Sequence, residues 1–246
     1  MSFFSNIKLI EDFLKIETDS QIEFEPIFHR VAQAFGPWPV VINDGGYKIK
    51  LFEWGLIADY MNTPEKINAT RSSMANARSE KILDDSRSVW YKLKKQRCLV
   101  FTTGFFEHHD AGLKKKVPFF IQNKEAPLLC FAGLYNYSPL PDKITGEMTG
   151  TFSIVTRPAN RLMAKIHNGG TNSQRMPLIL TRDLALKWLD NNLQDEILKN
   201  ILEYEFSQAS LKAWPVNTIR TQKEDNENVI REFAWPNFTP EIILND

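Results

Sequence analysis

Apolar residues alternate with polar ones, or run together, over most of the chain in a way that predicts many β-strands. Residues 39–43 (PVVIN) and 47–57 (YKIKLFEWGLI) flank Asp44, Gly45 and Gly46, and two such runs around this turn sequence predict a hairpin. Further strands are predicted at 97–108, 116–122, 128–137, 151–156, 176–181 and 211–216. A turn is expected at 110–112 and a loop at 141–148.

Helical spacing of apolar residues appears between these strands. Residues 6–16 place Ile7, Ile10, Phe13 and Leu14 on one face, with Ser5 as the N-cap. Other helices are expected at 86–96, at 159–166 with Pro158 at the start, at 182–189 and at 194–206. Helices and strands do not alternate regularly, which disfavours a doubly wound parallel sheet. We expect one α+β domain over residues 1–246, with mixed, mostly antiparallel sheets curled into a barrel-like core flanked by helices.

Composition narrows the class of protein without identifying a partner. The 246 residues are 43% hydrophobic and 24% charged, so the chain can bury a large core without disulfides. Lys and Arg balance Asp and Glu at 30 each, so any site for a polyanion has to be a local basic patch. Cys98 and Cys130 lie in apolar runs, which favours buried reduced thiols over a disulfide or a ligand pair. No membrane-spanning run or secretory signal is recognisable, and we expect a cytoplasmic protein.

Polar residues that interrupt apolar segments are the candidates for chemistry. Asn76, Arg78 and Glu80 alternate along a segment expected to be extended, so their side chains would share one face, although a solvated strand face is the favoured explanation of that pattern taken alone. Glu107 follows Phe105 and Phe106, and a carboxyl beside aromatic rings is partly desolvated, as in general acids made from Glu. An edge-strand Glu opposite a Lys is the alternative.

Histidines provide a second group of candidates. His167 ends a predicted helix before Gly169 and Gly170, where the imidazolium is favoured, either as a proton donor or as a simple C-cap. Arg175 opens the next strand and can point its planar guanidinium at a phosphate. His108 and His109 are expected to be exposed in a turn, and no Cys or Asp/Glu cluster completes a metal site around them. We expect no metal and no other cofactor.

Three separated motifs then carry a family resemblance. NARSE, GFFEHH and MAKIHN followed by RMPLIL, together with EWGLI, AGLYNY and WPV, resemble the SRAP family, the SOS-response-associated peptidase-like proteins that process abasic sites. The likeness runs from about Pro39 to Pro215. It implies single-stranded DNA with abasic sites as the partner. It also implies a covalent link, in which an N-terminal cysteine exposed by loss of Met attacks the abasic aldehyde and closes a thiazolidine.

The resemblance also implies roles for individual residues. Asn76 matches the residue that orients the attacking terminus, Glu107 the carboxyl that shuttles protons during imine formation, and His167 the histidine that helps open the sugar. DNA contacts are implied for Arg78 and Arg175, which match arginines that hold the backbone on either side of the lesion. Trp54 or Tyr60 is a candidate for stacking on the flanking bases, although a core position is favoured for Trp54.

Position 2 departs from the family pattern. Ser2 stands where the family has cysteine, either by deliberate replacement, by natural loss, or because the true start lies upstream. A serine hydroxyl is far less nucleophilic than a thiol, so the adduct is expected to be transient or absent. Removal of Met1 is expected, because Ser2 is small.

Two other functions stay open. A peptidase that processes its own Met1 with Glu107 and His167 is one, although no GxSxG motif supplies an internal nucleophile. A non-catalytic module that binds single-stranded DNA is the other. We expect a monomer. The spacing of residues 169–174 decides whether Arg175 reaches the site.

Overall fold

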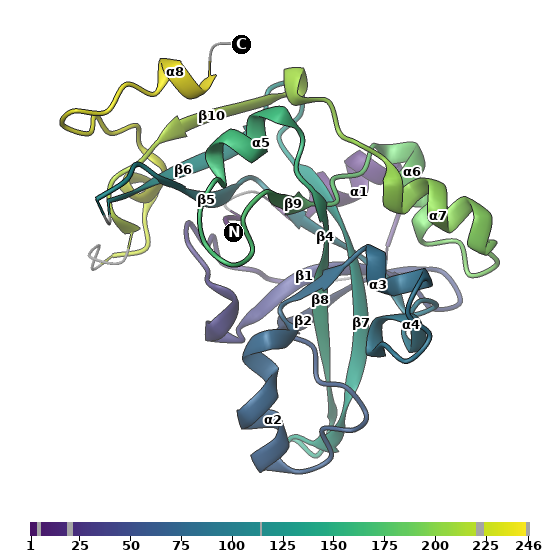
Figure 1. Cartoon of the computed structure of the whole chain (residues 1–246). Helices are drawn as coiled ribbons and strands as arrows, with labels where there is room; N and C mark the ends of the chain where they lie inside the picture. Colours follow the sequence, from purple (N-terminus) through teal and green to yellow (C-terminus); the bar gives the residue numbers. More distant parts are fainter. Residues whose placement is uncertain (4–5, 19–21, 114, 220–223, 245–246) are drawn as a thin grey trace.

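Five strands of the computed structural model close into a mixed barrel (Figure 1), and the description covers residues 1–3, 6–18, 22–113, 115–219 and 224–244. The barrel strands are β1 (Pro37–Asn43), β2 (Tyr47–Trp54), β4 (Arg97–Thr102), β7 (Leu129–Pro141) and β8 (Met148–Pro158). In the order β2, β1, β4, β7, β8 each strand pairs antiparallel with the next. A parallel pairing of β2 with β8, through Glu53↔Thr151 and Trp54↔Phe152, closes the barrel. The α+β expectation is confirmed.

Short strands extend this barrel at the end of β8. The strand β3 (Asn76–Arg78) pairs parallel with β8, and β9 (Arg175–Pro177) pairs antiparallel with the last residues of β8. A separate antiparallel sheet of three strands has the order β10 (Leu211–Pro215), β6 (Lys116–Asn123), β5 (Phe105–Asp110). In Figure 1 this sheet lies across one end of the barrel, next to the N-terminus.

Helices flank the barrel and the three-stranded sheet. Figure 1 shows α2 at the end of the barrel opposite the three-stranded sheet and α5 beside that sheet. The helices are α1 (Lys8–Leu14), α2 (Pro64–Thr70), α3 (Glu80–Leu83), α4 (Val89–Lys92), α5 (Arg161–Ile166), α6 (Arg182–Trp188), α7 (Asp195–Glu203) and α8 (Glu241–Leu244). No helix in the described ranges is long and apolar enough to cross a membrane.

The core sits inside the barrel and between the barrel and its helices. Strand β4 is buried at every position, and its backbone carbonyls at Phe101 and Cys98 accept hydrogen bonds from the indoles of Trp38 and Trp188, at 2.8 and 3.0 Å. Each buried indole N–H therefore has a partner. Cys98 and Cys130 are free and buried, as expected, and burial raises the pKa of both thiols. High thiol pKa values keep these cysteines unreactive.

Several predicted elements are confirmed with shifted ends. The hairpin forms as β1 and β2, and its turn places Gly45 and Gly46 at φ +66° and +141°, which other residues rarely adopt. The first helix covers Lys8–Leu14, and Ser5 lies outside the described residues. The helix predicted at 159–166 starts at Arg161 with the Asn160 side chain as its cap, whereas Pro158 ends β8.

Three predictions were wrong in detail. Glu80 does not continue the strand of Asn76 and Arg78, because the chain turns at Ser79 into α3. The strand expected at 176–181 is limited to β9, after which only an isolated bridge at Ile179 remains. His108 and His109 lie in β5 rather than in a turn, because β5 continues to Asp110 in pairing with β6.

Candidate active site

The first three residues form the middle strand of a small β arrangement. On one side they pair with residues 27–30, which we call the strap: the Met1 amine donates to the Arg30 carbonyl at 2.8 Å, and the Arg30 N–H donates back to the Met1 carbonyl at 2.9 Å. On the other side Ser2 N–H donates to the Gly104 carbonyl at 2.9 Å, and Thr103 N–H donates to the Ser2 carbonyl at 2.9 Å. The N-terminus is therefore fixed on both edges.

Gly104 allows this close approach. A Cβ at this position would lie 2.3 Å from the Phe120 ring and 2.8 Å from the Ile121 carbonyl oxygen, so any side chain would force the turn between β4 and β5 outward. The turn carries the carbonyl that holds Ser2 and leads directly into the strand that carries Glu107. The glycine of the GFFEHH motif thus places the N-terminus beside Glu107.

A cavity of about 660 Å³ begins at Met1 and collects most of the predicted residues. Its lining includes Asn76, Arg78, Glu107, His167, Arg175 and Trp54. Two predicted residues do not line it. Ser2 is fully buried behind Met1, with its hydroxyl donating to the Phe28 carbonyl, and Tyr60 is half exposed elsewhere on the surface. A second cavity of about 470 Å³ shares Glu107, His108 and His167 with the first.

Glu107 and His167 face each other from β5 and the end of α5. The carboxyl Oε2 lies 3.7 Å from His167 Nδ1, and the same nitrogen lies 3.1 Å from the Arg175 carbonyl oxygen. A carbonyl only accepts, so this contact makes Nδ1 the donor and leaves Nε2 as the acceptor of the neutral ring. His167 is also fixed through its backbone, which donates to Met163 and accepts from Gln174, both at 2.7 Å.

Burial disfavours charge on this side of the cavity. It lowers the pKa of the Met1 amine to about 5, against the opposing effect of Glu107. Burial also raises the pKa of the Glu107 carboxyl, although His167, the N-terminal charge and the His108 N–H act in the opposite direction. A neutral amine therefore lies in the same cavity as a carboxyl that holds its proton more tightly than usual. We call Met1, His29, Glu107 and His167 the N-terminal wall.

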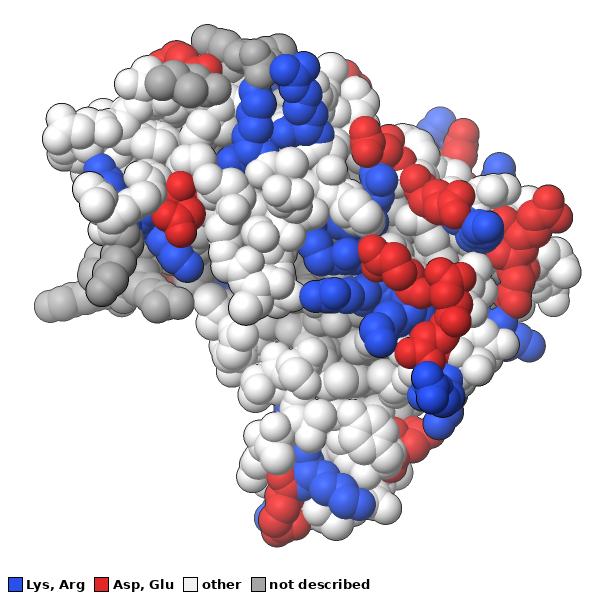
Figure 2. Space-filling model, in the orientation of Figure 1, with Lys and Arg blue, Asp and Glu red and all other residues white. Residues whose placement is uncertain are grey.

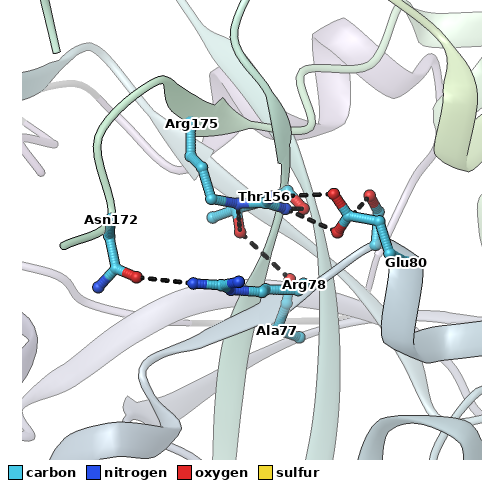
Figure 3. A network of polar contacts seen from close by, with 7 residues as sticks. Ala77, Arg78, Glu80, Thr156, Asn172 and Arg175 are labelled. Atoms are coloured by element: carbon cyan, nitrogen blue, oxygen red, sulfur yellow. Dashed lines mark hydrogen bonds and ion pairs between the residues drawn. The ribbon is translucent and has the colours of Figure 1, made fainter. Parts of the chain in front are cut away.

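Arg78 and Arg175 line another part of the cavity, and Glu80 pairs with Arg175 outside the lining. We call these three residues, which Figure 3 draws, the arginine wall. Arg175 donates to both oxygens of Glu80, at 2.8 and 2.9 Å, and to the Thr156 carbonyl at 2.7 Å. The Arg175 guanidinium is the main cause of the lowered pKa of Glu80.

Arg78 is held more loosely than Arg175. It donates to Asn172 at 3.0 Å and is exposed. Figure 3 shows the two guanidinium groups side by side, and Figure 2 shows basic side chains gathered at the centre of this face with acidic ones along one border. Residues 169–174 thus bring Arg175 to the cavity, and Asn172 with it.

Residues that the sequence did not single out also line the cavity. His29 and Arg30 reach it from the strap, which Asp225 holds through the N–H groups of Phe28, at 3.2 Å, and His29, at 2.7 Å. Trp54 is 9% exposed and donates to the Ala75 carbonyl, so the favoured core position fits, with one edge at the cavity. Within the described residues, no group of three or more His, Cys, Asp or Glu could hold a metal ion.

Comparisons with known proteins agree with this fold and these motifs. The family model "SOS response associated peptidase (SRAP)" matches residues 3–220. Abasic site processing protein YoqW of Bacillus subtilis (strain 168) is 31% identical over 188 residues, which cover 76% of this chain and 77% of that protein. Abasic site processing protein HMCES of Gallus gallus is 33% identical over 158 residues, or 56% of this chain and 44% of that protein.

Comparison with a crystal structure also identifies the fold. A protein from Bacteroides thetaiotaomicron superposes with a TM-score of 0.73 at 29% identity, covering 84% of this chain and 85% of that one. The family match spans the barrel, the turn that holds the N-terminus and the cavity residues other than Met1. The chain belongs to the SOS response associated peptidase (SRAP) family.

Proposed function

We propose that this chain binds single-stranded DNA at an abasic site and reacts with the open-chain aldehyde through its N-terminal amine. Relatives named as abasic site processing proteins support the substrate. The observation that carries the proposal is the position of the N-terminus, which lies in one cavity with Glu107 and His167 and is held there by hydrogen bonds on both edges. An amine anchored beside an acid and an imidazole suits Schiff-base formation.

In the proposed reaction, the residues of the cavity have different roles. His167 helps open the abasic sugar, the amine attacks the aldehyde carbon, and the Glu107 carboxyl protonates the oxygen. Asn76, on the rim, orients the attacking terminus. Arg78 and Arg175 contact phosphates on either side of the lesion without reading sequence, as a site without a base requires. Trp54 at the cavity edge and the half-exposed Tyr60 are the candidates to stack on flanking bases.

Ser2 limits the product once Met1 has been removed. Its nitrogen is anchored by the Gly104 carbonyl, and its hydroxyl is directed to the Phe28 carbonyl. The hydroxyl would have to leave this partner to close a five-membered ring on the imine, and an oxygen is a weaker nucleophile for that step than a thiolate. The product is therefore a reversible imine rather than a stable ring.

Trapping on a denaturing gel tests the proposal. The chain and a Ser2→Cys variant are mixed with single-stranded DNA carrying one abasic site, with and without borohydride, and mass spectrometry establishes whether Met1 is present. We expect the variant to form a stable adduct and the original chain to be linked only under reduction. If neither links after Met1 is shown to be absent, the covalent function fails and a non-catalytic DNA-binding role replaces it.

The same samples address the peptidase alternative. A protein that acts on abasic DNA leaves unstructured peptides intact, and its own Met1 is removed at the same rate when Glu107 is replaced by Gln. Cleavage of peptides by the original chain, lost in Glu107→Gln, would instead support a peptidase.

A further inference from the structure

His29 occupies an unusual position in the N-terminal wall. It lies in the strap directly before Arg30, whose carbonyl accepts the N-terminal amine, and it lines the same cavity as Met1 and Glu107. Its ring meets the Phe106 ring edge-on, with centroids 5.1 Å apart. The two Asp225 hydrogen bonds hold its backbone from the other side. His29 is therefore an imidazole in a defined place rather than a mobile loop residue.

The hydrogen bonds of the imidazoles distinguish His29 from its neighbours. His167 Nδ1 contacts the Arg175 carbonyl, and His109 Nδ1 contacts the Lys165 carbonyl at 2.9 Å. No residue in the described part of the chain hydrogen-bonds to the His29 ring, although that ring is half buried. A half-buried imidazole that lines a cavity can exchange protons with a molecule that enters it.

We propose that His29 is a second acid–base residue of this site, and that it accepts the proton released when the N-terminal amine attacks the aldehyde. This inference rests on the function proposed above and adds the proton acceptor that the attack requires. The new N–C bond forms as the carbonyl π electrons move to oxygen, Glu107 protonates that oxygen, and His29 takes the proton from nitrogen. His29 then returns its proton to the hydroxyl, which leaves as water, and the iminium is left beside the Glu107 carboxylate.

The pKa values of the groups in the N-terminal wall support this role for His29. Burial, together with the charges of the N-terminal amine and His108, lowers the pKa of His29 to about 4. While Met1 is present, the pKa of its amine is about 5, so the amine and His29 hold a proton with similar strength and both are neutral at pH 7. Glu107 and Asp225 raise the pKa of the amine whereas Arg30 lowers it, and His167 Nδ1 lies 3.7 Å from the Glu107 carboxyl.

The test compares His29→Ala and His29→Gln with the original chain. Rates of borohydride trapping are measured on abasic single-stranded DNA from pH 5 to 8, and affinity is measured on DNA with a tetrahydrofuran analogue, which has no aldehyde. We expect trapping to slow by ~100-fold at neutral pH with unchanged affinity, and added imidazole to restore much of the rate in His29→Ala. His109→Gln is the matched control and should trap at the original rate.

The possible failures are distinct from one another. Equal trapping by His29→Ala and the original chain overturns the role of His29 and leaves the proposed function standing. A loss that imidazole does not restore, accompanied by weaker binding of the analogue, shows that His29 only positions the strap, and this also overturns the proposal. If the original chain is never trapped, the proposed function and the inference built on it fall together.

Discussion

The two walls differ in whether their ionisable groups are shifted toward the neutral or the charged form. In the N-terminal wall burial is the largest influence, and it lowers the pKa of the Met1 amine to about 5 and that of His29 to about 4 while raising that of Glu107. In the arginine wall Glu80 is ionised more easily than usual, because Arg175 donates to both of its oxygens. The cavity is therefore lined both by groups that burial holds neutral and by Arg175, whose charge is paired with Glu80.

This difference depends on whether a group has an oppositely charged partner, and not only on how deeply it is buried. An ionisable group that loses water and gains no opposite charge changes to its neutral form, whereas one that gains a paired ion keeps its charge. Neutral groups with similar pKa values can pass protons to each other, and fixed charges can hold a phosphate backbone. Under the proposed function, the N-terminal wall supplies the proton transfers and the arginine wall contacts the phosphates.

Removing the acid of the N-terminal wall should have the largest effect. Glu107→Gln keeps the shape of the side chain and deletes its proton transfer, so we expect trapping on abasic DNA to slow by ~100-fold or more. Affinity for the tetrahydrofuran analogue should stay the same, because Glu107 is not a phosphate contact. Retention of the original rate would remove Glu107 from the mechanism and end the proposed contrast between the walls.

Acid should destabilise a chain that retains Met1. The amine has a pKa of about 5 folded and 8.0 unfolded, so the unfolded state binds more protons between these values and stability falls as pH drops from 8 to 5. Three units correspond to at most ~4 kcal/mol. The lowered pKa of His29 likewise reduces stability as pH falls from 6.5 to about 4. The raised pKa of Glu107 has the opposite effect above its unfolded value: it increases stability as pH falls and offsets part of the loss.

Urea unfolding at pH 8, 6.5 and 5 measures the slope of stability against pH. An NMR titration of the Met1 amine tests whether this group causes the slope. Stability that is constant or rises on acidification over this range would contradict the account of the N-terminal wall. His29→Gln should reduce the slope below pH 6.5, which separates the two groups.

Breaking the ion pair of the arginine wall should have a smaller effect, on stability. Glu80→Gln leaves Arg175 without its charged partner, and because the Glu80 side chain is 48% exposed we expect a loss of only about 1 kcal/mol. Thermal unfolding with Lys81→Gln as the control measures it, since Lys81 pairs with Asp85 on the surface. A loss no greater than that of the control would mean that Arg175 is held by Thr156 alone.

The smallest effect is expected at Arg78. Arg78→Gln should leave stability within about 0.5 kcal/mol, because Arg78 is exposed and its only charged or polar partner among the described residues is Asn172. It should weaken binding to single-stranded DNA and reduce the slope of log affinity against log salt by about 0.7. An unchanged slope would show that Arg78 does not contact phosphate.

Local patterns predicted the barrel better than they predicted the cavity. The hairpin of β1 and β2 and the buried strand β4 are encoded within short segments, by Gly45 and Gly46 at the turn and by an unbroken apolar run. Glu107 and His167 were identified because their motifs are also local, and the structure brings them within 3.7 Å.

The strap could not be predicted in the same way. Asp225 lies 197 and 196 positions from the two residues whose N–H groups it accepts, and no periodic pattern marks either segment. Glu80 was misplaced because a helix begins within a motif that reads as extended. His29 was missed since a single histidine in an irregular segment carries no signal until the fold places it beside Met1.

The enclosure of residues 1–3 has a consequence for the order of events during synthesis. Met1 leaves the ribosome first, but Gly104 and Asp225, which hold it and its strap in place, follow about 100 and 220 residues later. At ~5–20 residues per second, roughly 10–45 s pass before Asp225 has been made. During that interval an aminopeptidase can reach the first peptide bond, and afterwards the folded chain hides it. Under the proposed function, removal of Met1 is therefore expected to take place before the chain has folded.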